Sequence, residues 1–321
     1  MAQTPTVYRW DDPGAPQVVN GNYSELVNII DKCLVTGYGS KQPLGWIKEL
    51  DETLACSYKN LGSGHSVVFS SASGANDEKG VRVQSARNVL DADNLEREGY
   101  KQAFKAFPNK NTAWVIVGTS TAFYCFFCYV GSYEMPESLY QAGFFAGDLS
   151  NAITNDSSKF VAVCSFIAED LDLSSADAGS KYGSNIMFLN DREYNGYKLP
   201  INIYDTDGAE SFGKYIPTLI RNTTDTPTPG TASIPANYLE PILLIHKDYG
   251  KSFDRDSKPV FESKTRPAVR GQFPGLFTSL VGHPLQLIWP STVNYGNEFL
   301  ILKTASGAAN RLLVNTEVWD D

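Results

Sequence analysis

Residues 113–130 have the sequence AWVIVGTSTAFYCFFCYV, an almost unbroken hydrophobic run. Such a run fits a membrane-spanning helix, a redox or metal site built on its Cys-x-x-Cys, or two strands of a buried sheet. A membrane helix needs about 20 consecutive apolar residues, and this run is shorter and is interrupted at Gly118–Thr121. Its halves are rich in Val, Ile, Phe and Tyr, which favour strands. The pattern therefore predicts a β-hairpin that turns near Gly118–Thr121.

Membrane insertion is not expected elsewhere in the chain either. No other segment is long enough to cross a bilayer, and the N-terminus, MAQTPTVYRWDD, lacks the basic and apolar regions of a secretory signal. We therefore expect a protein that is made in the cytoplasm and does not insert into a membrane.

The cysteines do not indicate a metal or redox site. The chain has five of them: Cys33, Cys56, Cys125, Cys128 and Cys164. On a strand Cys125 and Cys128 point to opposite faces, whereas a redox Cys-x-x-Cys normally lies at a helix N-terminus. A zinc site needs two more ligands, and the histidines, His65, His246 and His283, are scattered. The odd number of cysteines also argues against a disulfide framework. We expect reduced, buried thiols, with no metal and no cofactor.

Composition and charge narrow the class of protein. The 321 residues are 42% hydrophobic, which is enough for a substantial core, and carry a formal net charge of −9. Nucleic-acid binding depends on clustered Lys and Arg, so we expect no nucleic-acid partner. The acidic residues are spread along the chain, as on a solvated surface that favours solubility.

Residues 22–39 carry the clearest helix signal. Asn22 can cap the N-terminus and Glu25 completes a capping box. The apolar residues on one face at helical spacing are Leu26, Ile29, Ile30, Cys33 and Leu34. Gly37 and Gly39 supply a C-terminal stop, so we expect a helix near residues 23–35 that packs on a sheet.

Most other segments have strand patterns. Short apolar runs with turns between them begin at TVYRW and continue to RLLVNTEVW. Residues 91–107 are the exception, because their pattern also fits a broken helix around Gly99. The fold class expected is mostly β, with antiparallel sheets in a sandwich or barrel and one clear N-terminal helix. Residues 1–321 are expected to form one large domain, with the Thr/Pro-rich segment 222–237 as an exposed loop or a boundary.

No sequence motif indicates an enzyme. The chain has no Gly-rich nucleotide-binding loop and no Gly-x-Ser-x-Gly elbow. Three groups of acidic residues come nearest to a site. Asp170 and Asp172 resemble part of a calcium loop, and Asp205, Asp207 and Glu210 fit a surface Asp-Gly turn. Glu134 and Glu137 flank a Met-Pro turn. A glycosidase needs two carboxylates across a cleft, and spacing in the sequence does not show such a pair. We identify no catalytic residue.

Aromatic residues occur beside Pro and Gly in several stretches, and five stretches in a fixed order resemble a known family. They are VYRWDDPGAP, DKCLVTGYGSKQPLGW, AWVIVGTSTAFYCFF, QAGFFAGDL and RPAVRGQFPGLFTSL. This series resembles structural proteins of tailed-bacteriophage virions, of the tail, baseplate or neck. Trp46 follows Gly45 as in that family, Ala146 is an insertion within its Phe-Phe-Gly-Asp pattern, and Gln272 and Phe273 lie within its Arg-Gly…Pro-Gly-Leu pattern.

The resemblance implies a non-enzymatic virion component, made in the host cytoplasm, whose partners are other virion proteins and copies of itself. One alternative is a fibre module that binds a host surface glycan through exposed aromatic residues, and another is a carbohydrate-active enzyme. Contacts between subunits favour aromatic and Arg side chains at loop tips. The interface residues predicted on this basis are Tyr8, Arg9, Trp10, Arg266, Arg270, Phe273, Phe277 and Trp289. The alternative for Trp10, Phe273 and Phe277 is a place in the core of the chain itself.

Overall fold

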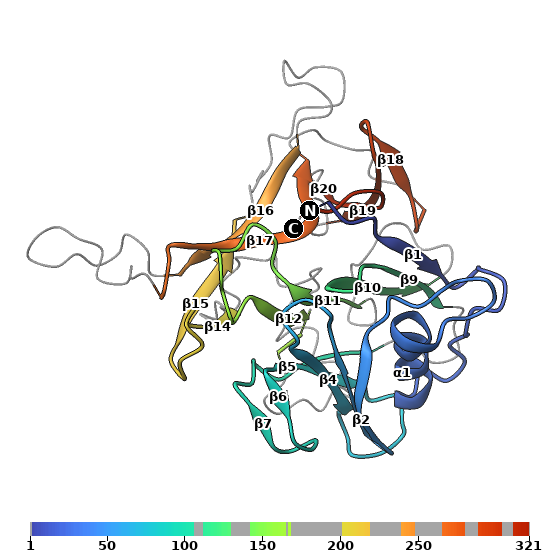
Figure 1. Ribbon diagram of the computed structural model, residues 1–321. Helices are drawn as coiled ribbons and strands as arrows, with labels where there is room; N and C mark the ends of the chain where they lie inside the picture. Colours follow the sequence, from blue (N-terminus) through green and yellow to red (C-terminus); the bar gives the residue numbers. More distant parts are fainter. Residues whose placement is uncertain are drawn as a thin grey trace, which may run out of the picture.

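The computed structural model consists of antiparallel sheets stacked in layers (Figure 1). It describes residues 2–105, 112–129, 142–164, 166–167, 201–218, 239–247, 265–279, 288–303 and 311–320. Three sheets of five, six and seven strands contain nearly all of the strands, and a two-stranded ribbon completes the described part. The five-stranded sheet is the middle layer, because one hydrophobic cluster joins it to the six-stranded sheet and a second joins it to the seven-stranded sheet.

The middle sheet contains the predicted hairpin. Its strands, in order, are β1 (Thr6–Arg9), β9 (Thr112–Gly118), β10 (Ala122–Tyr129), β11 (Ala142–Asp148) and β12 (Phe160–Cys164). Strands β9 and β10 pair antiparallel with Gly118 opposite Phe123, and the backbone N–H of Thr119 donates to the carbonyl of Ala122 at 2.8 Å. The hairpin and its turn are therefore confirmed.

Both faces of the middle sheet are buried, which explains why its central strands are hydrophobic without interruption. The side chains directed toward the six-stranded sheet and the helix include Trp114, Ile116, Phe123, Cys125, Phe127 and Phe144. Those directed toward the seven-stranded sheet include Val115, Val117, Tyr124, Phe126, Cys128 and Phe145. A sheet with one wet face would alternate apolar and polar residues. Cys125 and Cys128 lie on opposite faces, as predicted.

The six-stranded sheet is formed mainly by consecutive hairpins. Its strands, in order, are β13 (Phe166–Ile167), β8 (Gln102–Phe104), β5 (Val81–Ala86), β4 (Ser66–Ser71), β3 (Ala55–Lys59) and β2 (Ile47–Glu52). The ribbon of β6 (Asn88–Val89) and β7 (Leu95–Glu96) follows β5. Strand β2 is an edge strand and carries charged residues, which discourage pairing with another chain.

The broken helix predicted for residues 91–107 is wrong. The Asp91 carboxylate accepts hydrogen bonds from the backbone N–H groups of Asp93 and Asn94, both at 2.9 Å, and this local turn competes with a helix. Further along, the backbone N–H of Gly99 donates to the carbonyl of Ser85 at 2.9 Å, and strand β8 pairs with β5. Tertiary pairing has overridden the weak helical pattern.

The predicted helix is present as α1 (Tyr23–Asp31), which continues as a π-helical turn, η1 (Lys32–Thr36). The side chain of Asn22 accepts a hydrogen bond from the backbone N–H of Glu25 at 3.0 Å, so Asn22 is the cap. The Glu25 carboxylate accepts from the backbone N–H groups of residues 19–21 rather than from that of Asn22. The predicted apolar face is fully buried: Leu26, Ile29, Ile30, Cys33 and Leu34.

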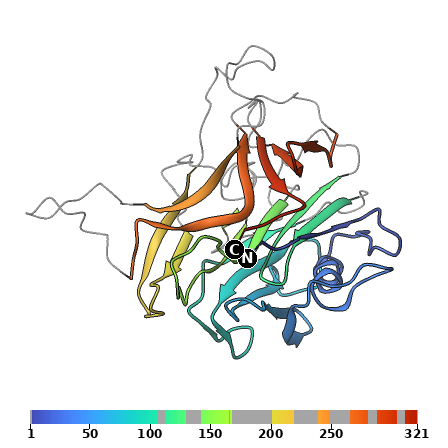
Figure 2. The same cartoon turned by 45° about the horizontal axis from the view of Figure 1, so that its top comes forward.

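The seven-stranded sheet covers the other side of the middle sheet. Its strands, in order, are β14 (Ile201–Tyr204), β15 (Phe212–Pro217), β16 (Leu239–His246), β17 (Val269–Ser279), β20 (Arg311–Asn315), β19 (Glu298–Lys303) and β18 (Thr292–Asn294). Strand β17 curves strongly (Figure 2), and its pairing with β16 shifts register between Pro241 and Leu243. Gly275 has a φ of +63°, and a Cβ there would lie 2.3 Å from the Trp319 ring, so the bend needs glycine.

The two ends of the chain lie close together, as the N and C marks in Figures 1 and 2 show. Gln3 and Trp319 form a two-way backbone bridge, with N···O distances of 2.7 and 2.9 Å. The mostly β class with antiparallel sheets is confirmed, and the described strands form open stacked sheets rather than a closed barrel. The segment 222–237 lies outside the described residues, so its role as a loop or boundary stays a prediction.

Candidate functional site

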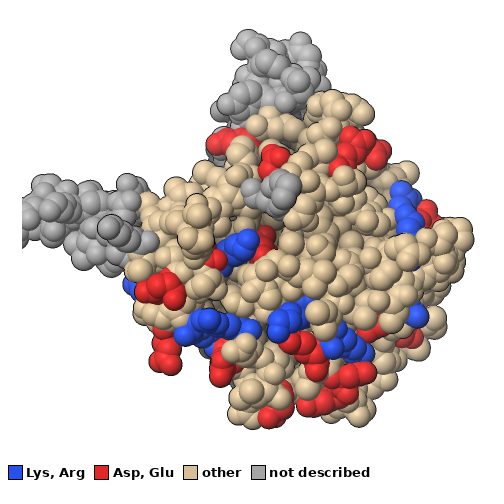
Figure 3. All heavy atoms as spheres, viewed as in Figure 1, with Lys and Arg blue, Asp and Glu red and all other residues tan. Residues whose placement is uncertain are grey.

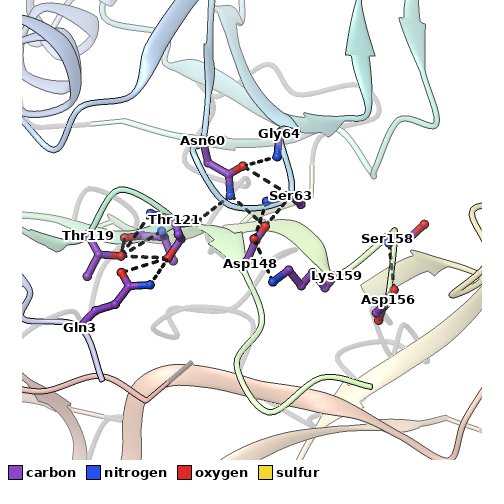
Figure 4. A network of polar contacts seen from close by, with 11 residues as sticks. Gln3, Asn60, Ser63, Gly64, Thr119, Thr121, Asp148, Asp156, Ser158 and Lys159 are labelled. Carbon is purple, nitrogen blue, oxygen red and sulfur yellow. Dashed lines mark hydrogen bonds and ion pairs between the residues drawn. The ribbon is translucent and has the colours of Figure 1, made fainter. Parts of the chain in front are cut away.

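A network of polar side chains lies where turns from two sheets meet the start of the chain (Figure 4). At its centre is the buried carboxylate of Asp148, at the end of β11. It accepts hydrogen bonds from Asn60 Nδ2 at 2.8 Å, from the backbone N–H of Ser63 at 2.8 Å and from Ser63 Oγ at 2.6 Å. Lys159 Nζ lies 3.4 Å from its second oxygen. We call these four residues the Asp148 junction.

The Asp148 junction fastens the six-stranded sheet to the middle sheet. Asn60 directly follows β3, and its Nδ2 also donates to the carbonyl of Thr121, at 2.8 Å, in the β9–β10 turn. Its Oδ1 accepts from the backbone N–H of Gly64 at 2.9 Å, which closes the turn between β3 and β4. A side-chain amide that satisfies backbone groups in two turns holds both in one geometry.

The hydrogen-bond pattern at the junction is that of a structural clamp. In a Ser-His-Asp arrangement a histidine lies between the hydroxyl and the carboxylate, but Ser63 Oγ donates directly to Asp148. The nearby His65 ring instead packs edge-on against Phe160, with centroids 6.1 Å apart. Burial lowers the pKa of His65, which favours the neutral imidazole. In this geometry no histidine lies between Ser63 Oγ and the Asp148 carboxylate to accept the proton of the hydroxyl.

A second buried polar group fixes the loop between β11 and β12. Arg270 and Asp156 form a bidentate ion pair with distances of 2.7 and 2.8 Å, and both side chains are 0% exposed. Arg270 Nη2 also donates to the carbonyl of Tyr204 at 2.6 Å. The guanidinium therefore joins β17, β14 and the loop that carries Asp156.

The acidic turn at Asp205 also pairs with an arginine. Asp205 follows β14, and its carboxylate accepts from Arg266 Nε at 2.9 Å and Nη2 at 3.0 Å, and from Ser211 Oγ at 2.6 Å. The backbone N–H of Gly208 donates to the carbonyl of Asp205 at 2.8 Å, so this is the expected Asp-Gly turn of a hairpin. The calcium-like Asp170 and Asp172, and the pair Glu134 and Glu137, lie outside the described residues.

Four of the residues predicted at an interface are buried within the chain: Tyr8, Arg270, Phe273 and Trp289. Tyr8 donates its hydroxyl to the carbonyl of Gln42 at 2.6 Å, and Trp289 Nε1 donates to the carbonyl of Ala113 at 3.1 Å. The Phe273 ring packs edge-on against Phe145, with centroids 5.1 Å apart. These side chains stabilise this chain and offer no free surface, so for them the interface prediction is corrected. Tyr8, Phe273 and Trp289 belong to the hydrophobic clusters between the sheets, and Arg270 pairs with the buried Asp156.

The other four predicted interface residues are partly exposed: Arg9, Trp10, Arg266 and Phe277. Arg9 pairs with Asp11 through two 2.8 Å hydrogen bonds, and its guanidinium lies 5.2 Å from the centre of the Trp10 ring. Trp10 also packs against both hydrophobic clusters. Phe277 packs edge-on against Phe299, at 5.9 Å between centroids. Their part in an interface stays a prediction.

The residues of the Asp148 junction and Asp156 were not singled out from the sequence. Asp148 lies within the QAGFFAGDL stretch, in which the aromatic residues are more prominent than the single carboxylate. Asn60 and Ser63 stand in an ordinary turn composition, and their partner is more than 80 positions away in the chain. Only the folded arrangement makes these residues conspicuous.

The part of the chain that the structure describes contains no group of three or more His, Cys, Asp or Glu side chains placed to hold a metal ion. Within the same residues, no helix combines the length and the apolar character that a bilayer span requires. No protein-family model matches the chain, and no curated protein is significantly similar to it.

Proposed function

We propose that the protein is a non-enzymatic structural component of a tailed-bacteriophage virion, present in several copies at the tail, neck or baseplate. It would assemble with copies of itself and with other virion proteins. The proposal begins from the series of five stretches that resembles such proteins.

The observation that carries the proposal is that these five stretches, remote in sequence, pack together around the middle sheet. Strand β1 of the first stretch pairs with β9 of the third. The second stretch contacts both: Lys41 Nζ donates to the carbonyl of Val7 at 2.8 Å, and Trp46 Nε1 donates to that of Thr119 at 3.0 Å. If the five stretches resemble such proteins because the fold is shared, we expect them to contact one another in the structure, and they do.

The last two stretches complete this framework. Phe145 of the fourth stretch packs against Phe273 of the fifth, and Tyr124 Oη in the hairpin donates to the carbonyl of Pro274 at 2.8 Å. Most of the resembling side chains are therefore buried supports rather than a reaction centre. This distribution fits a protein whose role is mechanical, although a fold by itself does not determine a function.

The visible surface also fits a protein partner better than a nucleic acid. On the face shown in Figure 3, Lys and Arg lie among Asp and Glu, with wide uncharged areas between them, rather than in one continuous basic area. A phosphate backbone is bound through clustered Lys and Arg. Repeated contacts between subunits instead use apolar and aromatic groups with a polar rim, as Trp10 beside Arg9 and Asp11 provides.

Mass spectrometry of purified phage particles, with copy number per particle, tests the proposal. We expect the protein in the particle at a fixed copy number greater than one, consistent with closed symmetry. Absence from the particle contradicts the proposal. A glycan array and a polysaccharide-degradation assay test the two alternatives: glycan binding favours a receptor-binding fibre module, and degradation favours a carbohydrate-active enzyme.

A further inference from the structure

The outer face of the six-stranded sheet, turned away from the middle sheet, is hollowed into a groove of about 470 Å³. The strand register explains the hollow. One cross-strand row on this face contains Glu52, Ala55, Ser70 and Arg82, each directly opposite the next. Two small side chains therefore separate an acidic from a basic one, and neighbouring strands are about 4.8 Å apart. The small residues form the floor of the groove.

Basic groups gather at one end of the groove. Lys101 precedes β8, where Ala103 is opposite Arg82, so Lys101 lies diagonally from Arg82 on the same face. Such diagonal neighbours are within reach of long side chains. Neither Arg82 nor Lys101 forms an ion pair with any residue that the structure describes. The two cations are therefore available to an anion.

Polar groups line the rest of the groove. Gln84 is buried beside Arg82, and its Nε2 donates to Glu98 Oε2 at 2.8 Å and to the carbonyl of Gly99 at 2.9 Å. These two hydrogen bonds fix the Gln84 amide through its nitrogen, so its oxygen can accept a hydrogen bond from a ligand. The Ser70 hydroxyl and the carboxylates of Glu52 and Asp93 add a donor and acceptors. Among the residues that the structure describes, none of those lining the groove is aromatic, so these residues offer no ring for stacking.

We propose that this groove binds a small polyhydroxylated molecule that carries one anionic group, with the anion at Arg82 and Lys101 and the hydroxyl groups along Ser70, Gln84 and Glu52. The volume lies within the range of about 300 to 1,000 Å³ that is common for small-ligand sites. A charge-assisted pair with a guanidinium supplies both orientation and affinity. The site is separate from the Asp148 junction and does not depend on the virion role.

Isothermal titration calorimetry of the full chain with three sugars tests this proposal. The probes are galacturonate, which carries a carboxylate, glucose 6-phosphate, which carries a phosphate, and neutral galactose. We expect at least one acidic sugar to bind with a Kd below about 1 mM and galactose to bind at least roughly 10-fold more weakly. The order of the two acidic sugars distinguishes a carboxylate from a phosphate ligand. Affinity should fall with ionic strength.

Three substitutions and a matched control assign any binding to the groove. Arg82→Gln and Lys101→Gln should each weaken acidic-sugar binding, roughly 10- to 100-fold for Arg82. Ser70→Leu should fill the floor and abolish binding. The control, Lys79→Gln, removes an exposed cation that does not line the groove. Because Lys101 is exposed, Lys101→Gln should fold even if Arg82→Gln does not. Equal binding of neutral and acidic sugars, no binding of any, or unchanged binding by Lys101→Gln overturns the proposal.

Discussion

Arg270 and Asp156 form a fully buried ion pair, although 114 positions separate them in the chain. The two parallel hydrogen bonds, of 2.7 and 2.8 Å, give the strong bidentate geometry of a guanidinium and a carboxylate. Because the two charges are buried and hydrogen-bonded to each other, removing one partner leaves the other charge buried without its ion-pair partner. The pair therefore determines whether β17 and the loop before β12 can pack together.

Arg270→Met should lower the free energy of unfolding by about 3 to 5 kcal/mol, because it leaves the Asp156 carboxylate buried without its partner. Chemical denaturation measures the loss. The double variant Arg270→Met with Asp156→Leu should lose less than Arg270→Met alone, because no charge then remains. As a control, Lys59→Ala removes a partly exposed pair with Glu49 and should cost only about 0 to 1 kcal/mol. Equal losses for Arg270→Met and Lys59→Ala contradict the prediction.

Asp205 should make stability depend on pH in the acid range. Burial acts to raise the pKa of Asp205, but hydrogen bonds from Arg266 and Ser211 outweigh it and hold this pKa below its usual value. The unfolded chain therefore binds this proton more readily than the folded protein does. The resulting stability is fully present above the unfolded pKa of about 3.9 and is lost as the pH falls through the lower folded pKa.

Asp205→Asn should accordingly lose less stability than the parent when the pH is lowered from about 5 to about 3. Denaturant titrations at several pH values measure the difference. Asp207→Asn, which changes an exposed carboxylate in the same turn, is the matched control and should follow the parent. If Asp205→Asn and the parent change in parallel, the pairing with Arg266 does not stabilise the fold.

The five cysteines should be unreactive in the folded protein. All five are buried thiols rather than disulfides, and burial raises the pKa of Cys56 to about 11 and also raises the pKa of Cys33 and Cys125. The thiolate is the reactive form, and at pH 8 it is only about one part in a thousand of Cys56. A thiol-reactive dye should label five groups in guanidinium chloride and almost none before unfolding. Rapid native labelling of Cys125 or Cys128 contradicts the buried hairpin.

Much of the local structure could be predicted because its causes are local. Two apolar, strand-forming runs joined by a Gly-Thr-Ser-Thr turn predict the hairpin, and Asn22 with an apolar stripe predicts the helix. The burial of Arg270 could not be predicted, since an arginine beside Pro and Gly is typical of an exposed loop, and Asp156 becomes its partner only in three dimensions. The groove likewise depends on the register of β3, β4 and β5, which no single segment encodes.

Ile30→Asp should destabilise the protein severely. Ile30 is fully buried between α1 and the sheets, in the cluster that contains Leu26 and Phe69. A carboxylate there would lose its hydration without gaining a partner, which should cost at least about 3 kcal/mol. Thermal melting measures the loss. Asn28→Asp places the same group on the exposed side of the helix and should melt close to the parent. A parent-like Ile30→Asp variant means that the helix does not pack on the sheets.

Substitutions of Arg9 and Trp10 should distinguish an effect on subunit assembly from an effect on folding. Trp10 packs against both hydrophobic clusters, so Trp10→Ala should lower stability by about 1 to 3 kcal/mol in the isolated chain. The Arg9 side chain is 39% exposed and pairs with Asp11, whose side chain is 47% exposed, so Arg9→Ala should cost about 0 to 1 kcal/mol.

If Arg9 contacts a neighbouring subunit, Arg9→Ala should melt like the parent yet enter particles or oligomers less efficiently, because interfacial arginines often contribute strongly to binding. Thermal melting of the isolated chain and copy number in purified particles measure the two effects separately. Lys79→Ala, which removes another exposed cation far along the chain, controls for a general effect of charge. Normal incorporation of Arg9→Ala removes Arg9 from the predicted interface, and unfolding of the isolated variant assigns its side chain to the fold instead.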